Sequence, residues 1–199
     1  MDADAVEIRV LGCLIEKQRT TPDAYPLSLN ALRLACNQTT NRDPIADYDE
    51  RTIKAALDRM SNRGWTRFAS GASSRALKYR HLLNEALSLS DEELSVLAVL
   101  MLRGPQTLGE LKQRTERLHR FDSLADVAQT LETLAGRELV IRLERRPGQK
   151  EERYAQLLGG DTPVEEAAVQ DGTDRMAAIE ARLDRLEEAF DELRSGLGR

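Results

Sequence analysis

One apolar pattern occurs twice in this chain and most constrains its fold. Residues 49–63 place apolar side chains on one face of a helix, and residues 123–136 do the same. The correspondence is one of pattern more than of identity and occurs only twice, so it predicts a duplicated fold unit and not a solenoid of short repeats. Aligning the two segments superimposes Ile53 on Val127, Leu57 on Leu131, Met60 on Leu134 and Trp65 on Leu139.

The elements around the first copy are three helices and a hairpin. Helices are predicted over residues 5–18, after Ser28 and over residues 49–63. Asp49 is the expected N-cap of the third helix, and Gly64 occupies the position that usually ends one. Two strand-like runs flank a Gly/Ser turn in "WTRFASGASSRALKYRHL".

The second copy repeats this order. A helix capped by Ser90, with Glu93 completing a capping box, precedes helices over residues 106–115 and 123–136. The hairpin "ELVIRLERRPGQKEERYAQLL" follows, with its turn at "RPGQ". Three helices closed by a hairpin are the winged-helix form of helix-turn-helix. The expected fold class is mostly α with small β-hairpins (α+β), as tandem winged-helix domains over residues 1–83 and 84–158 plus a C-terminal helix.

The last part of the chain has a different composition. Residues 159–173 are rich in Gly, Pro and acids and are interpreted as a linker. Residues 174–195 show the 3-4 spacing of a coiled-coil seam, which predicts a short dimer clamp, and the alternative is a helix folded back on the body. The predicted seam consists of Met176, Ile179, Leu183, Leu186, Phe190 and Leu193.

Charge is distributed unevenly along the chain. The total is −5, yet residues 1–83 carry +3, residues 84–158 carry −2 and residues 159–199 carry −6. A polyanionic partner is therefore expected at the first domain. The outward face of helix 49–63 is suited to phosphates and base edges, and the alternative is a merely solvated face. The expected DNA contacts are Arg42, Arg51, Lys54, Arg59, Asn62, Arg75 and Lys78, with Arg80 also on the wing.

The matching face of the second unit carries no basic residue. Phosphate neutralisation is absent there, and small neutral side chains allow close packing. This face is expected to meet the other domain or another subunit. Its members are Ala125, Ala128, Gln129, Glu132, Thr133 and Gly136.

Cysteine and histidine are few. Cys13 and Cys36 are expected to be small buried hydrophobic residues in a reducing compartment, and His81 and His119 are expected at the surface. None of the four forms a CxxC or HxxxH pair, so no metal site is predicted.

The string "EKQRTTPDAYPLSLNALRLACNQTTNRDP" resembles the bacterial YceH family, and the resemblance extends over about residues 5–158. It implies tandem winged-helix domains and a homodimer, and it implies no reaction. It also places residues 37–44 between the second and third helices. One interpretation is a hydrogen-bonded loop that sets the angle of the third helix. The other is that Asn41 and Arg42 touch phosphates or a partner protein.

Two functions remain open from the sequence. One is a dimeric, DNA-associated regulatory protein, and the other is a protein-interaction scaffold without DNA binding. An enzyme is not expected, because no nucleophile–base pair, phosphate-binding Gly loop or metal cluster is visible. No cofactor and no membrane span are predicted, and an acidic N-terminal stretch unlike a signal peptide makes the cytoplasm the expected location.

Overall fold

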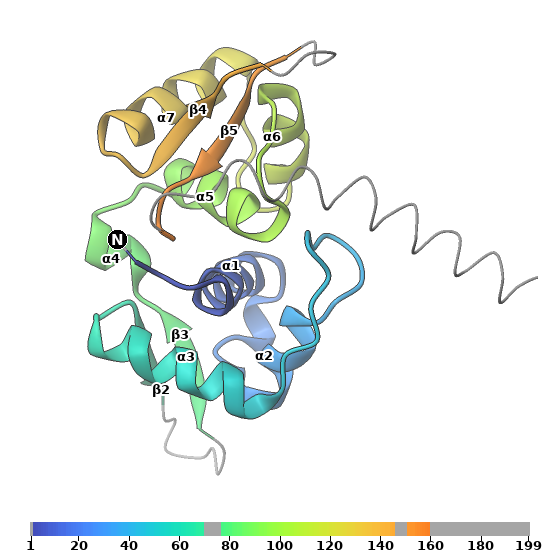
Figure 1. Cartoon of the computed structure of the whole chain (residues 1–199), viewed down its shortest axis with the longest axis vertical. Helices are drawn as coiled ribbons and strands as arrows, with labels where there is room; N and C mark the ends of the chain where they lie inside the picture. The colour runs from blue at the N-terminus through green and yellow to red at the C-terminus, as the bar shows by residue number, and fades with distance from the viewer. Residues whose placement is uncertain (1, 70–76, 146–150, 160–199) are drawn as a thin grey trace, which may run out of the picture. The chain divides into compact units, whose positions relative to one another are not determined.

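The computed structural model describes residues 2–69, 77–145 and 151–159 (Figure 1). They belong to one compact unit, residues 1–160, and residues 161–199 lie outside the described residues. Seven α-helices and five short strands make the described part a mostly helical α+β structure, which confirms the predicted class. Arg75, the turn at 146–149 and the six predicted seam residues (Met176, Ile179, Leu183, Leu186, Phe190 and Leu193) also lie outside the described residues.

The first half, residues 2–82, contains three α-helices and a small sheet. The sheet is antiparallel in the order β1-β3-β2, with Phe68 opposite Tyr79 and Leu27 also opposite Tyr79. Its elements are α1 (Ala5–Thr20), the 3-10 helix η1 (Pro22–Ala24), β1 (Leu27–Ser28), α2 (Leu29–Cys36), α3 (Glu50–Asn62), β2 (Thr66–Ala69) and β3 (Lys78–His81).

The second half, residues 88–159, repeats the arrangement after a short connecting helix, α4 (Leu83–Leu87). The third helix and the strand after it recur at one constant spacing, since α3 corresponds to α7 and β2 to β4 from their first residues onward. The elements of this half are α5 (Asp91–Arg103), α6 (Leu108–Thr115), α7 (Leu124–Gly136), β4 (Val140–Leu143) and β5 (Arg153–Gln156).

Local chemistry begins and ends these helices as predicted. The Ser28 side chain accepts a hydrogen bond from the Ala31 amide, and the Asp49 side chain accepts one from the Thr52 amide. Ser90 and Glu93 form a reciprocal capping box. Gly64 follows α3 with a φ of +73°, a conformation that favours glycine.

The repeated apolar positions form the inward face of each third helix. Every residue of the pattern is buried in both halves, from Ile53 and Val127 to Trp65 and Leu139. Helix α1 lies between α3 and α5 and packs on both (Figure 1). Consequently Val10, Leu11, Cys13, Leu14 and Ile15 have no exposed surface.

The two halves meet along α1 and α5 at unusually close range. A Cβ added at Gly12 of α1 would lie 2.8 Å from Cγ of Leu102 in α5. The approach of the two helices therefore requires a residue without a side chain at position 12. The division of the chain into domains at residues 83 and 84, which falls within α4, stays a prediction.

Two pairings that the sequence did not predict extend the small sheets. Strand β1 precedes α2 and adds to β3, and an isolated bridge between Gln106 and Tyr154 occupies the corresponding place before α6. These pairings are too short to produce an alternating apolar pattern. None of the helices in the described part of the chain combines the length and the apolar character needed to cross a bilayer.

Candidate nucleic-acid interface

The outward face of α3 is exposed, as the sequence predicts. Arg51, Arg59 and Asn62 are exposed and Lys54 is half-buried. Within the described residues, Arg51 makes no hydrogen bond or ion pair, so its guanidinium is available to an anion. The other cations of this helix have partners inside the chain.

Lys54 is held by one acid and one ring. Its Nζ lies 2.5 Å from Oδ1 of Asp58, one turn further along α3, and 5.6 Å from the centre of the Phe68 ring. The hydrogen bond to Asp58 raises the pKa of Lys54 above its usual value. An incoming phosphate would therefore compete with Asp58 for this ammonium group.

Arg59 and Arg63 bind acids of α1 and of its N-cap. Nε of Arg59 lies 2.9 Å from Oε1 of Glu7, and Arg59 also pairs with Asp4. Arg63 pairs with the same Glu7, whose side chain is almost completely buried. Hydrogen bonding to Glu7 raises the pKa of Arg59. These pairs fasten the end of α3 to the start of α1, so Arg59 already has a structural role.

A third group of cations lies on the sheet of the first half. Arg67 of β2 is directly opposite Arg80 of β3, and Lys78 is two residues before Arg80 on the same side of the strand. We call Arg67, Lys78 and Arg80 the outer sheet face, because they alternate with residues of the opposite side, of which Thr66, Tyr79 and His81 are buried and Phe68 is partly exposed. Arg67 is exposed, and Lys78 and Arg80 are half-buried.

The outward face of α7 is also exposed but uncharged apart from one acid. Ala125, Gln129, Glu132, Thr133 and Gly136 are exposed, and Ala128 is half-buried. No element of the first half covers this face within the described residues. The expected contact with the other domain is therefore not formed, and contact with another subunit stays a prediction.

Arg42 lies inside the molecule, which corrects the expectation of a phosphate contact. Its side chain has no exposed surface, and its Nη2 lies 2.6 Å from Oε2 of Glu16 in α1. Its Nε also donates to the carbonyl of Ala35 at 3.0 Å. Burial lowers the pKa of the Arg42 guanidinium, but the hydrogen bond to Glu16 and the nearby negative charges together outweigh burial and raise it.

The loop that carries Arg42 connects the two halves. The amide of Asp43 donates to the carbonyl of Leu102 in α5 at 2.8 Å, and Arg103 donates to the side chain of Asn41. This loop runs from 37 to 49, whereas the loop between α6 and α7 is shorter and runs from 116 to 123. The longer loop thus reaches the end of α5. This arrangement favours the interpretation that residues 37–44 form a hydrogen-bonded structural loop.

Both cysteines are buried as predicted, but the prediction of a surface position for His81 is wrong. His81 is 2% exposed, and its Nε2 lies 2.6 Å from Oε1 of Gln18. Burial lowers its pKa from the usual 6.5 to about 4, and the charges of Arg19 and Arg80 act in the same direction. The imidazole is therefore neutral at pH 7. The alternation of side chains along a strand could have predicted this burial, since His81 lies two residues after the buried Tyr79 and therefore on the same side of the sheet.

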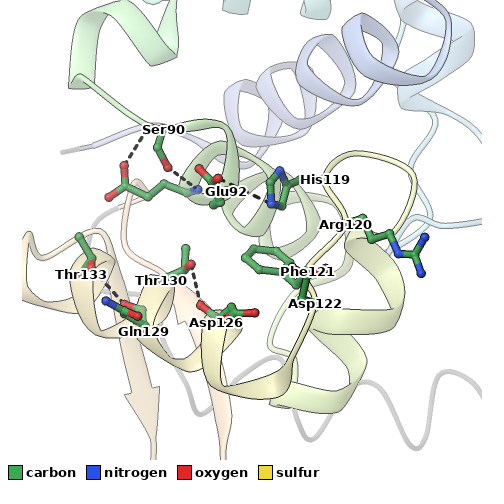
Figure 2. A pocket seen from close by; sticks show the side chains of 11 residues that line it. Ser90, Glu92, His119, Arg120, Phe121, Asp122, Asp126, Gln129, Thr130 and Thr133 are labelled. Carbon is green, nitrogen blue, oxygen red and sulfur yellow. Dashed lines mark hydrogen bonds and ion pairs between the residues drawn. The ribbon is translucent and has the colours of Figure 1, made fainter.

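The second half contains a cavity of about 650 Å³ between the start of α5 and α7 (Figure 2). Its polar side chains are occupied locally: Thr130 donates to the carbonyl of Asp126, and Thr133 to that of Gln129. His119 lies 3.7 Å from Glu92, with its ring edge-on to Phe121. The eleven lining residues show no nucleophile beside a base, so the cavity is not the candidate site.

Comparison with known proteins places this chain in a family. A family model described as "Protein of unknown function, DUF480" matches residues 3–149. A UPF0502 protein of Solibacter usitatus is 46% identical over 198 residues, covering 96% of both chains. One from Opitutus terrae is 51% identical over 165 residues, covering 81% of this chain and 72% of the relative. One from Pseudomonas aeruginosa is 47% identical over 179 residues, covering 90% and 80%.

The chain belongs to the UPF0502 family. This is the YceH-type family that the loop sequence resembles, so the predicted membership is confirmed. The region matched by the DUF480 model includes α3, α7 and the loop between α2 and α3. The names of these UPF0502 relatives state no activity, ligand or partner.

Proposed function

We propose that this UPF0502 protein is a non-enzymatic, tandem winged-helix protein that binds duplex DNA through its first half. The support for the winged-helix arrangement is the order of the elements. In each half three α-helices precede an antiparallel strand pair, and the third helix turns one face outward. In winged-helix proteins that third helix is the one offered to the major groove.

The observation that carries the proposal is the contrast between two matched faces. Helices α3 and α7 are both exposed on their outward sides. Basic side chains, Arg51 and Lys54, lie on that side of α3, whereas α7 has none there. Basic side chains matter for DNA affinity because neutralising the charge of the DNA backbone supplies most of the sequence-independent affinity. The first half is therefore the DNA-binding half, and the second half is its structural support.

Two further features belong to this proposal. The protein acts as a homodimer, for which the 3-4 apolar spacing between Met176 and Leu193 supplies a seam. It acts in the cytoplasm, a reducing compartment that suits the free thiols of Cys13 and Cys36.

Binding to a random-sequence duplex over a range of salt concentrations tests the proposal. We expect affinity to fall steeply with salt, with a log–log slope of about −0.9 per phosphate contact. Arg51→Ala combined with Lys54→Ala should weaken binding and flatten the slope. Gln129→Ala combined with Thr133→Ala, the matched change on α7, should leave both affinity and slope unchanged. Lack of duplex binding by the wild-type protein at low salt would refute DNA binding.

A second candidate is a protein-interaction scaffold that uses the same fold for assembly. Two observations favour it: the pairing of Lys54 and Arg59 with acids, and four large apolar side chains left exposed in the first half. These are Leu34, at 57% exposure, Ile45, at 66%, Phe68, at 42%, and Leu77, at 58%. Exposed apolar residues of this size are more typical of protein contacts than of phosphate contacts. If duplex binding is absent at low salt, the scaffold becomes the better description.

A further inference from the structure

We propose that the outer sheet face of the first half, and not α3, makes most of the phosphate contacts, so that nucleic acid is bound through its backbone and without sequence preference. This inference rests on the proposed DNA binding and specifies its mode. Lys54 is bound to Asp58 and Arg59 to Asp4 and Glu7, which leaves Arg51 as the one outward cation of α3 without a partner within the described residues.

The outer sheet face has the opposite character. No hydrogen bond or ion pair holds Arg67 or Lys78 within the described residues, and Arg80 has one contact, with Glu85 at 3.4 Å. Both pairs are exposed, but the Arg80–Glu85 contact is longer than the 2.5 Å contact of Lys54 with Asp58, so Arg80 is held less closely. Among the residues that the structure describes, these three cations therefore have one carboxylate partner, Glu85.

The register places two of these cations where they repel each other. Arg67 and Arg80 are directly opposite across β2 and β3, a position at which like charges destabilise an antiparallel pair. In the second half the pair at the same place in the hairpin is Ile141 and Ala155, which carries no charge. The equivalent of Lys78 is Arg153, and this residue is paired with Glu110 at 3.0 Å.

The same backbone thus tolerates an uncharged pair where the first half has two arginines. A polyanion laid across the sheet removes the repulsion, because phosphate oxygens accept hydrogen bonds from both guanidinium groups. Phosphates carry no base identity, so these contacts position the duplex without reading its sequence.

The test compares two double variants with the wild-type protein, all as full chains, on several duplexes of unrelated sequence. Arg67→Thr with Lys78→Thr should reduce the magnitude of the log–log salt slope by about 2, equally on every duplex. Arg51→Ala with Lys54→Ala should reduce it by about 1 or less. Thermal unfolding should show Arg67→Thr alone to be at least as stable as the wild type, because it removes the repulsion with Arg80. Ile141→Thr is the matched control in the second half and should leave binding unchanged.

The outcomes separate this inference from the function on which it rests. The salt slope of the Arg67→Thr/Lys78→Thr variant could equal that of the wild type while the Arg51→Ala/Lys54→Ala variant has a flatter slope. That result would overturn phosphate binding by the outer sheet face and would leave DNA binding in place. Losses that differ strongly between duplexes overturn the sequence-independent mode, since they require base contacts. Absence of duplex binding by the wild-type protein overturns both.

Discussion

Helices α3 and α7 occupy matching places in the two halves of this UPF0502 protein, and they differ mainly in the side chains on their outward faces. Each has 13 residues, begins with a side-chain cap and buries its apolar pattern. Both helix ends are fastened by an arginine at the C-cap, since Arg63 pairs with Glu7 of α1 and Arg137 with Glu93 of α5. The difference lies in the outward face, where α3 carries basic side chains and α7 has none.

The loops before these helices extend the comparison. The longer loop of the first half contains a buried arginine and reaches α5, while the shorter loop of the second half keeps both of its arginines, Arg117 and Arg120, at the surface. The additional length of the first loop is thus associated with the contact between the halves.

The largest expected effect in this comparison is that of Arg42→Ala. Removing it leaves Glu16 and the Ala35 carbonyl without their donor, so the free energy of unfolding should fall by about 3–5 kcal/mol. Urea denaturation measures the change. Arg120→Ala, in the matching loop, removes an exposed pair with Glu116 and should change stability by less than about 0.5 kcal/mol. Similar losses in both variants would show that the two loops are equivalent.

The pH dependence of stability should be specific to the first half. His81 has a folded-state pKa of about 4 against 6.5 in the unfolded chain, so the unfolded state binds more protons between these values. Its contribution of about 3 kcal/mol is fully present above pH 6.5 and is lost as pH falls towards 4.

His81→Gln gives this position the residue that the second half has there, Gln156. The variant should lose the decline in stability between pH 6.5 and 4, as measured by urea denaturation at each pH. His119→Gln, at a partly exposed histidine, is the control and should keep the decline. A decline retained in His81→Gln would place the titrating group elsewhere.

A smaller effect is expected at the contact between the halves. Gly12→Ala forces a methyl group against Leu102 and should lower stability by about 1–3 kcal/mol. Gly109→Ala, in helix α6, meets nothing within 4 Å and should raise stability by about 0.5–1 kcal/mol. Thermal unfolding of the two variants decides the point, and a shift of the same sign in both would argue against close packing at Gly12.

The smallest effect tests what the halves share. Ser28 caps α2 and Thr107 caps α6, each through a hydrogen bond of 3.2 Å. Ser28→Ala and Thr107→Ala should each cost about 1 kcal/mol in chemical denaturation. Ser28→Asp, which keeps an acceptor at the N-cap, should retain most of the stability. A much larger loss in one half would show that the second helices do not depend on their caps equally.

Helices and caps were predictable from the sequence because their causes are local. Apolar spacing located α3 and α7 closely, and Ser28, Asp49 and Ser90 act on amides three positions away. The fate of individual cations was not predictable, because their partners lie far along the chain. Arg42 meets Glu16 and Arg59 meets Asp4 only after the helices have packed. Strand register likewise decides which residues lie opposite each other, so the charged pair Arg67–Arg80 and the uncharged pair Ile141–Ala155 were not predictable either.

Helix α1, covered by α3 on one side and by α5 on the other, also affects how the chain is made. Its apolar residues are buried on both sides, but α5 is complete only at Arg103, long after α1 ends at Thr20. At the usual ribosomal rate of about 5–20 residues per second, the surface of α1 that α5 will cover stays exposed for roughly 4–17 s during synthesis. The first half therefore leaves the ribosome with one side of its central apolar helix uncovered until α5 has been made.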